Sequence, residues 1–210
     1  RTLKFEIVRN DTLGIAMGGT TGVAVPFYPI ALYDRDGAPV TSMVAAYAVH
    51  HDASVNIADA YCEEGFDFSG TKNFDQKTGY RSRSFLTVPM KDHENEIIGV
   101  LQLLNAKDRI TGAVCPFSEA DLHLAESLAS QAAIALTNRL LVNRLEHLFE
   151  SFIGLINAAI DDKSPYTSGH CARVPVLTMM LADAVDNCKV GPLKSFTMSE
   201  RDRHELKIAG

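Results

Sequence analysis

Residues 56–105 decide the fold, and they begin with Asn56-Ile57-Ala58-Asp59-Ala60-Tyr61. After a polar segment the chain continues with Asp75-Gln76-Lys77-Thr78-Gly79-Tyr80-Arg81-Ser82-Arg83-Ser84. An apolar run then ends near Pro89, and a polar turn at residues 92–95 leads into a second apolar run, residues 97–105. Two apolar runs joined by a short polar turn predict an antiparallel hairpin. The acid, hydroxyls and glycine that precede it are expected in a loop that closes a small-ligand pocket against a sheet.

Composition excludes several classes of function. The chain has 210 residues, a net charge of −6 and an apolar fraction of 46%, which is enough for one large or two small domains. The negative charge argues against nucleic-acid binding, and no apolar run reaches the ~18 residues that a membrane span needs. Widely spaced cysteines favour reduced thiols in a cytoplasmic protein. These cysteines are Cys62, Cys115, Cys171 and Cys188.

The first fifty residues carry three further strand signals, at residues 3–8, 27–33 and 42–50. An Asp-Gly turn at residues 34–37 is expected to join the second to the third. The glycine-rich residues 18–22 predict a plain loop. A phosphate-binding loop is disfavoured there because no Lys-Ser or Lys-Thr follows the last glycine.

A long helix is predicted from residue 119. Ser118 followed by Asp121 resembles an N-cap with an acidic partner three residues later. A heptad seam then recurs in steps of four and three at Ile134, Asn138, Leu141, Leu145, Leu148, Phe152, Leu155 and Ala159. Up to about Asn138 we expect this seam to pack on the domain's own sheet. Beyond Leu140 we expect a coiled coil with a partner chain, with Asn138 fixing the register of two strands.

The blocks within residues 56–105 resemble, in order, the second half of a GAF domain, and most closely the cyclic-nucleotide-binding branch of that family. The resemblance covers nearly all of residues 1–139. It implies an α/β (α+β) fold with a central antiparallel sheet flanked by helices, and it implies that the N-terminal part of the domain is missing. In that branch an acid and hydroxyls line the ligand pocket. The matching residues are Asp75, Thr78 and Ser82, with Gln102 on the following strand.

The implied ligand is a small molecule, with cyclic nucleotides as the leading class. The residues alone leave open that Asp75 and Thr78 simply form an Asx-type turn. The family also has a supporting set, of which Asn105, Phe117 and Asp121 match three members. The sequence departs from that set in having alanine at position 106 and leucine at position 122, where the family has Lys and Glu.

A second resemblance begins where the helix is expected to break, at residues 161–166, since the residue before a proline disfavours helical backbone. Residues 162–174 resemble the start of an HD-GYP domain, a metal-dependent phosphohydrolase that hydrolyses cyclic di-GMP with iron or manganese. His170 matches the first His of that pattern, a metal ligand in some members. Tyr166 replaces a Glu of some members, which implies a two-metal site. A structural His at a helix start is the alternative.

These resemblances predict a sensor domain (residues 1–139), a connecting coiled-coil helix (140–160) and the N-terminal part of an HD-GYP-like domain (161–210). Both ends are expected to be cut, the second just before the His-Asp pair of that domain. The implied function is the sensory region of a bacterial signalling protein that controls a cyclic di-GMP phosphodiesterase. The fragment itself is expected to be an inactive homodimer without a cofactor, since iron or manganese belongs to the complete HD domain. A ligand-free dimerisation module and a GAF regulator of another output remain as alternatives.

Overall fold

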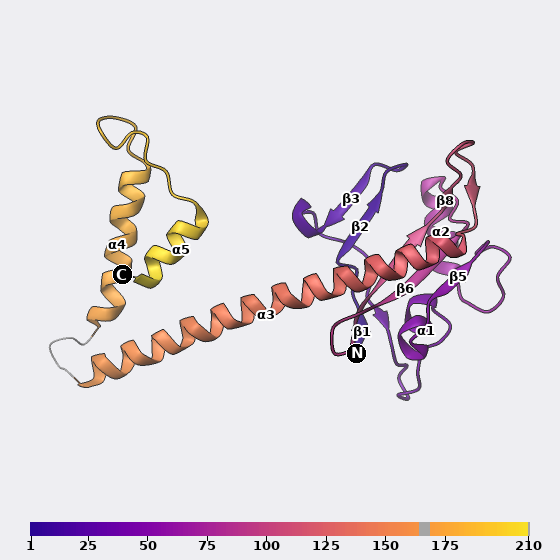
Figure 1. Cartoon of the computed structure of the whole chain (residues 1–210), viewed down its shortest axis with the longest axis horizontal. Helices are drawn as coiled ribbons and strands as arrows, with labels where there is room; N and C mark the ends of the chain where they lie inside the picture. The colour runs from indigo at the N-terminus through magenta and orange to yellow at the C-terminus, as the bar shows by residue number, and fades with distance from the viewer. Residues whose placement is uncertain (164–168, 210) are drawn as a thin grey trace. The chain divides into compact units, whose positions relative to one another are not determined.

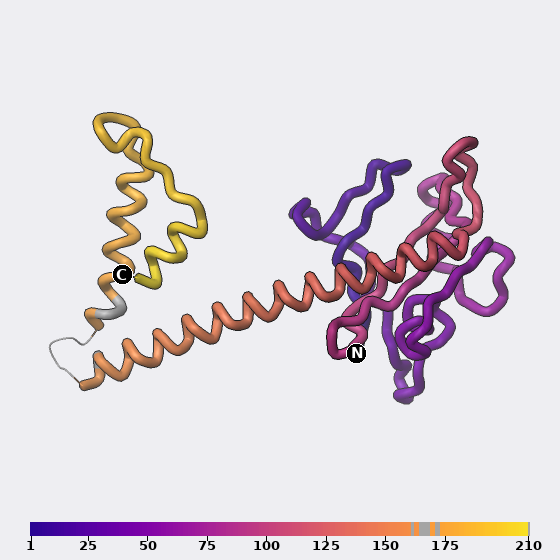
Figure 2. Tube along the Cα trace, viewed as in Figure 1, coloured from indigo at the N-terminus to yellow at the C-terminus, as the bar shows by residue number. Residues whose placement is uncertain are grey.

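The computed structural model describes residues 1–163 and 169–209, and the chain divides into two units, Arg1–Asn138 and Arg139–Gly210. Figure 1 labels the elements of each unit, and Figure 2 traces the chain through them. The strands of the first unit are β1 (Thr2–Leu3), β2 (Ile7–Asn10), β3 (Ile15–Gly18), β4 (Ile30–Ala31), β5 (Val55–Ile57), β6 (Phe85–Lys91), β7 (Ile97–Leu104), β8 (Ala106–Lys107) and β9 (Val114–Cys115). Its helices are η1 (Gly19–Thr21), α1 (Val44–His51), α2 (Ser69–Thr78) and the first part of α3 (Glu119–Lys163).

The predicted hairpin is confirmed. Strands β6 and β7 pair in antiparallel register, and β5 pairs with the other edge of β6. The turn between β6 and β7 is closed by the Asp92 carboxylate, which accepts the backbone N–H groups of Glu94 and Glu96 at 3.0 Å each. The remaining strands form separate pairs, β1 with β4, β2 with β3 and β8 with β9.

The two faces of this sheet are covered by different helices, because side chains alternate between faces along a strand. On one face Phe85 packs into a cluster with residues of α1 and of the segment that leads into α2; this cluster is Val44, Ile57, Ala60, Phe68 and Phe85. On the other face Leu86 and Val88 pack against Ala125 and Ala129 of α3. The expectation of a mixed α/β fold with an antiparallel sheet flanked by helices is confirmed (Figure 1).

The strand prediction for residues 42–50 is wrong, because this segment contains α1. Alanine favours helix more than any other residue, and Val44 and Ala48, four residues apart, are both buried. Residues 3–8 form parts of two strands with different partners. Of the run 27–33, residues 30 and 31 form β4, and Tyr33 forms an isolated bridge with Pro39. The Asp-Gly turn is confirmed, since Asp34 accepts backbone hydrogen bonds from residues 36 and 38.

The glycine-rich segment at residues 18–22 forms the short helix η1 with its flanking turns. Gly18 adopts a φ of +75°, which side chains rarely tolerate. A Cβ atom there would lie 1.8 Å from the carbonyl oxygen of Glu6, so glycine is required at this position for β3 to pair with β2.

Helix α3 begins as predicted. The Asp121 carboxylate accepts the Ser118 backbone N–H at 2.9 Å and the Ser118 hydroxyl at 2.7 Å. In return, the Asp121 backbone N–H donates to the Ser118 hydroxyl at 3.2 Å, which completes a reciprocal cap. These bonds hold the pKa of Asp121 below its usual value.

The expectation that the seam packs on its own sheet up to Asn138 is wrong. The face of α3 that lies on the sheet runs through Ala125, Ala129 and Ala133, while Ile134 is 40% exposed and Asn138 is exposed. Small side chains allow the helix backbone to approach β6 closely, and this places the larger seam residues on the outer side. Helix α3 continues through Lys163, and residues 164–166 of the predicted break lie outside the described residues.

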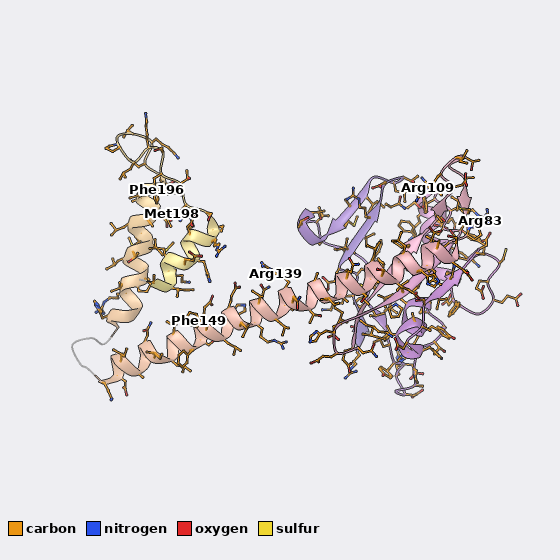
Figure 3. All side chains as sticks on the ribbon, in the orientation of Figure 1. Arg83, Arg109, Arg139, Phe149, Phe196 and Met198 are labelled. Carbon is orange, nitrogen blue, oxygen red and sulfur yellow. The ribbon has the colours of Figure 1, made fainter. Side chains whose placement is uncertain are left out.

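The second unit contains the end of α3 together with α4 (His170–Asp186) and α5 (Glu200–Ala209). Helices α4 and α5 pack together, and Arg203 of α5 forms ion pairs with Asp183 and Asp186 of α4. An apolar groove of about 570 Å³ between them includes Phe196 and Met198 (Figure 3). Among the described helices, none combines the length and apolarity that a bilayer crossing requires.

Candidate functional site

Asp75 is the centre of a buried polar cluster in the first unit. Its carboxylate accepts hydrogen bonds from the Ser82 backbone N–H at 2.7 Å, the Ser82 hydroxyl at 2.8 Å and the Tyr61 hydroxyl at 2.8 Å. Asp75 and Ser82 are only 3% and 2% exposed. The cluster is satisfied from within, as a buried carboxylate requires. The Asx-type turn is therefore wrong for Asp75, whose partners lie seven and fourteen residues away.

The segment 79–84, here called the latch loop, follows α2 and leads into β6. Gly79 ends α2 in the left-handed conformation, with a φ of 69°. Asn105, at the end of β7, then fixes the middle of the loop. Its amide nitrogen donates to the Tyr80 hydroxyl and the Arg81 carbonyl at 2.8 Å each, and its oxygen accepts the Arg83 N–H at 2.7 Å.

Further contacts tie the latch loop to the segment after β5. The Ala60 N–H donates to the Arg83 carbonyl at 2.8 Å, and the Arg83 guanidinium pairs with Asp59 at 3.2 Å. The Arg81 guanidinium lies over the Tyr61 ring, 4.3 Å from its centroid. The hydrogen bond to Asp75 raises the pKa of Tyr61 above its ordinary value. The latch loop is thus held at both ends and in the middle.

Thr78 and Gln102 lie differently from Asp75 and Ser82. Thr78 ends α2; its hydroxyl donates to the Phe74 carbonyl at 2.8 Å and accepts the Tyr80 N–H at 3.4 Å, so it closes a local turn. Asp75 and Thr78 had been expected in a loop, but both are helical. Gln102 lies on β7 opposite Thr87, to whose hydroxyl its amide donates at 3.0 Å.

The register places Gln102 on the face of the sheet that α1 covers, since directly opposed residues share a face and Thr87 alternates with Leu86. Gln102 is nonetheless exposed, and so is Leu104 on the same face. The structure therefore brings Asp75 and Ser82 together, leaves Thr78 in its own turn, and presents Gln102 on an open part of the sheet.

Several residues of this site were not selected from the sequence. Tyr61, Asp59 and Arg81 stand inside the quoted blocks, but the family resemblance implies other positions for the pocket. Asn105 was noted only as a match to the family's supporting set, and the structure shows that it holds the latch loop. The exposed groups of the latch loop include the Arg81 and Arg83 guanidinium groups, the first of which lies over the Tyr61 ring. Such a surface suits an anionic ligand with a planar ring.

In the second unit, His170 is the first residue of α4 and is exposed. It borders a cleft of about 480 Å³ together with residues of α3 and α5, among them Glu150 and His204, which pair at 3.1 Å. Within residues 1–163 and 169–209, no three His, Cys, Asp or Glu side chains gather as metal ligands would. The described residues do not fit a metal site, and we assign no catalytic step to His170.

Comparison with known proteins assigns the first unit to a protein family. Residues 15–136, more than half of the chain, match the family model described as GAF domain. Over 95 residues the chain is 32% identical to the dual 3',5'-cyclic-AMP and -GMP phosphodiesterase 11A of Takifugu rubripes and 34% identical to the dual 3',5'-cyclic-AMP and -GMP phosphodiesterase 11 of Drosophila melanogaster. The match covers 45% of this chain but only 10% and 6% of those relatives.

Proposed function

Because the chain belongs to the GAF domain family, we propose that its first unit is a small-ligand sensor and that the ligand is a cyclic nucleotide. The carrying observation is the combination of a latch loop held by many hydrogen bonds with an exposed Gln102 on the sheet face that α1 covers. The relatives are phosphodiesterases named for cyclic AMP and cyclic GMP, which supports the same ligand class.

The four residues selected from the sequence would contribute in two ways. Gln102 offers both a donor and an acceptor to the edge of a base. Asp75 and Ser82 are occupied with each other, so their contribution is to hold the latch loop as a wall of the site. Thr78 ends α2 next to that wall.

Thermal unfolding with cyclic AMP or cyclic GMP tests the ligand. A ligand at 100 times its dissociation constant stabilises the folded state by about 2.7 kcal/mol, which raises the melting temperature by several degrees. The Gln102→Ala variant should lose most of this shift, whereas Asn187→Ala, an exposed amide residue in the second unit, should keep it. No shift with either nucleotide at millimolar concentration would favour the alternative of a ligand-free module.

We further propose that the chain is a parallel homodimer through the part of α3 beyond Asn138. The side chains at issue are 43–70% exposed: Leu141, Leu145, Leu148, Phe152 and Leu155. The chain's own helices leave them open, because the cleft to α4 and α5 is bordered by Glu150, Ile153, Gly154 and Asn157. At 100° per residue these positions lie on the opposite side of α3 from the seam.

Replacement of Leu145 and Leu148 by Glu tests the dimer. Complete burial of each leucine contributes about 1.5–3 kcal/mol, and each variant chain also places charges in the seam. The expected result is a monomeric mass in solution at tens of micromolar, where the parent chain is dimeric. A double variant with the parent's dimeric mass would refute the interface, as would a parent chain that is itself monomeric.

For the whole protein we propose a bacterial, cytoplasmic regulator whose output is an HD-GYP type cyclic di-GMP phosphodiesterase. The support is the sequence pattern of residues 162–174, with His170 at the start of α4. One imidazole cannot hold a catalytic metal. The 210-residue chain should therefore show no cyclic di-GMP hydrolysis with added manganese or iron, and activity above a buffer blank would contradict this assignment.

A further inference from the structure

Helix α3 carries two overlapping seams. The first is the seam that the sequence predicts. The second follows the same steps of four and three but begins earlier in α3, and it consists of Leu124, Leu128, Gln131, Ala135, Asn138, Val142, Leu145, Phe149, Phe152 and Ile156. The two seams share Asn138, Leu145 and Phe152, a row of side chains here called the shared row, which the second seam extends to Leu124 and Gln131.

The rows on either side of the shared row are equally suited to a partner. One side row is Ile134, Leu141, Leu148 and Leu155, and the other is Leu128, Ala135, Val142, Phe149 and Ile156. Both are exposed: Leu148 to 61% and Phe149 to 59%. Figure 3 labels Phe149 on α3. Neither carries a charge, since Arg139, Arg144 and Glu146 lie outside all three rows.

A two-stranded coiled coil buries only two rows, so it cannot use all three at once. The large apolar side chains of each seam expose roughly 340–380 Å², taking ~100 Å² for a fully exposed side chain. The apolar part, about 57%, of the ~600–1,000 Å² that each partner buries in a standard interface is roughly 340–570 Å². One seam of two rows therefore reaches the lower part of that range for a second copy of this chain, and the third row is left over.

We propose that a second copy packs against α3 in two alternative ways, through the shared row with either the first or the second side row. The proposal rests on the homodimer proposed above. With 100° per residue, the centres of the two seams differ by about 50°, so exchange between them is a rotation of each helix about its axis. Two packings of similar apolar content form a bistable element of the kind that an effector can bias.

The position of Asn138 indicates how the helices move when the two packings exchange. A buried asparagine fixes register in a two-stranded coil, and Asn138 lies on the shared row, so it faces the partner in both packings. The exchange is therefore a rotation without sliding. Since the second seam begins at Leu124 and Leu128, on the part of α3 that covers the sheet, the second packing involves more of the sensor's own helix segment than the first, which begins at Ile134.

Disulfide cross-linking of the full chain tests the two packings. Leu148→Cys reports the first side row, Phe149→Cys the second, and Asn143→Cys, on the opposite face of α3, is the matched control. Both reporters should cross-link at least several-fold faster than the control, with a product mass of two chains. Cross-linking of only one reporter above the control would overturn the proposal, and so would a four-chain assembly, which would use all three rows at once.

Charged substitutions then separate exchange from a fixed dimer. Leu141→Lys with Leu148→Lys blocks the first packing, and Val142→Lys with Phe149→Lys blocks the second. Each pair should leave a dimer and raise the cross-linking rate of the other row's reporter about twofold or more. An unchanged rate with both pairs, or a monomer with either pair, would overturn two packings. A monomeric parent chain would instead refute the homodimer itself.

Discussion

The two parts of α3 on either side of Asn138 are both rich in apolar residues, yet they lie in different environments. On the sheet, Ala125, Ala129 and Ala133 are at most 2% exposed. Beyond Asn138 the apolar side chains are mainly Leu and Phe, and Leu145 and Leu148 are 65% and 61% exposed. The comparison teaches that small buried residues mark the surface that meets the chain's own sheet, while the large apolar residues beyond it stay exposed.

The largest expected effect separates these two environments directly. Leu86→Ala removes a fully buried side chain that contacts α3, and it should lower the free energy of unfolding by about 2–5 kcal/mol. Leu148→Ala deletes the same atoms from an exposed site and should change the stability of the first unit by less than about 0.5 kcal/mol. Urea unfolding of both variants measures the difference, and equal losses would break the comparison.

The next largest effect tests whether the stability of the first unit depends on its latch loop as well as on α3. Asp75→Asn keeps the shape but cannot accept all the hydrogen bonds of the buried carboxylate. The expected loss of stability is about 1–3 kcal/mol. Asp36→Asn, in an exposed turn, should be nearly neutral. If urea unfolding shows no loss for Asp75→Asn, packing against α3 alone sustains this unit.

A smaller effect compares the same helix cap in the two units. Ser118 caps α3, and Ser199 caps α5 through the same reciprocal bonds with Asp202. Replacing either serine by alanine should cost about 1 kcal/mol. Amide hydrogen exchange should show the loss for Ser118→Ala in the first unit and for Ser199→Ala in the second. A loss spread evenly over both units would show that they unfold together.

The smallest effect is a dependence on pH. Hydrogen bonds from Ser118 and Ser199 hold the pKa values of Asp121 and Asp202 below their ordinary value. A carboxyl with a lowered folded pKa stabilises the fold above its unfolded pKa of about 3.9, and this stabilisation is lost as pH falls through the folded pKa. The stability difference between the parent and Asp121→Asn should therefore be constant near neutral pH and shrink below about pH 4. Melting temperatures of both proteins across this range measure it, and a difference that grows on acidification would contradict the cap.

Local sequence patterns predicted the structure correctly where the interacting residues are close in the chain. The β6–β7 hairpin and the cap of α3 each depend on groups only a few residues apart, and each is confirmed. The strand prediction for residues 42–50 failed because alternation over a few apolar residues does not distinguish a strand from a buried alanine-rich helix. The GAF family was recognisable because its blocks recur in order, and the family match covers them.

The sequence by itself determined the hairpin, the start of α3 and the spacing of the seam. Tertiary structure alone decided that Asp75 turns inward to Ser82 and Tyr61, and that Asn105 holds a loop more than twenty residues earlier in the chain. It also decided that the alanine row of α3 meets the sheet. The reason is physical: a periodic pattern reports only that a side chain lies on an apolar face. Which surface covers that face depends on segments that folding brings from far along the chain.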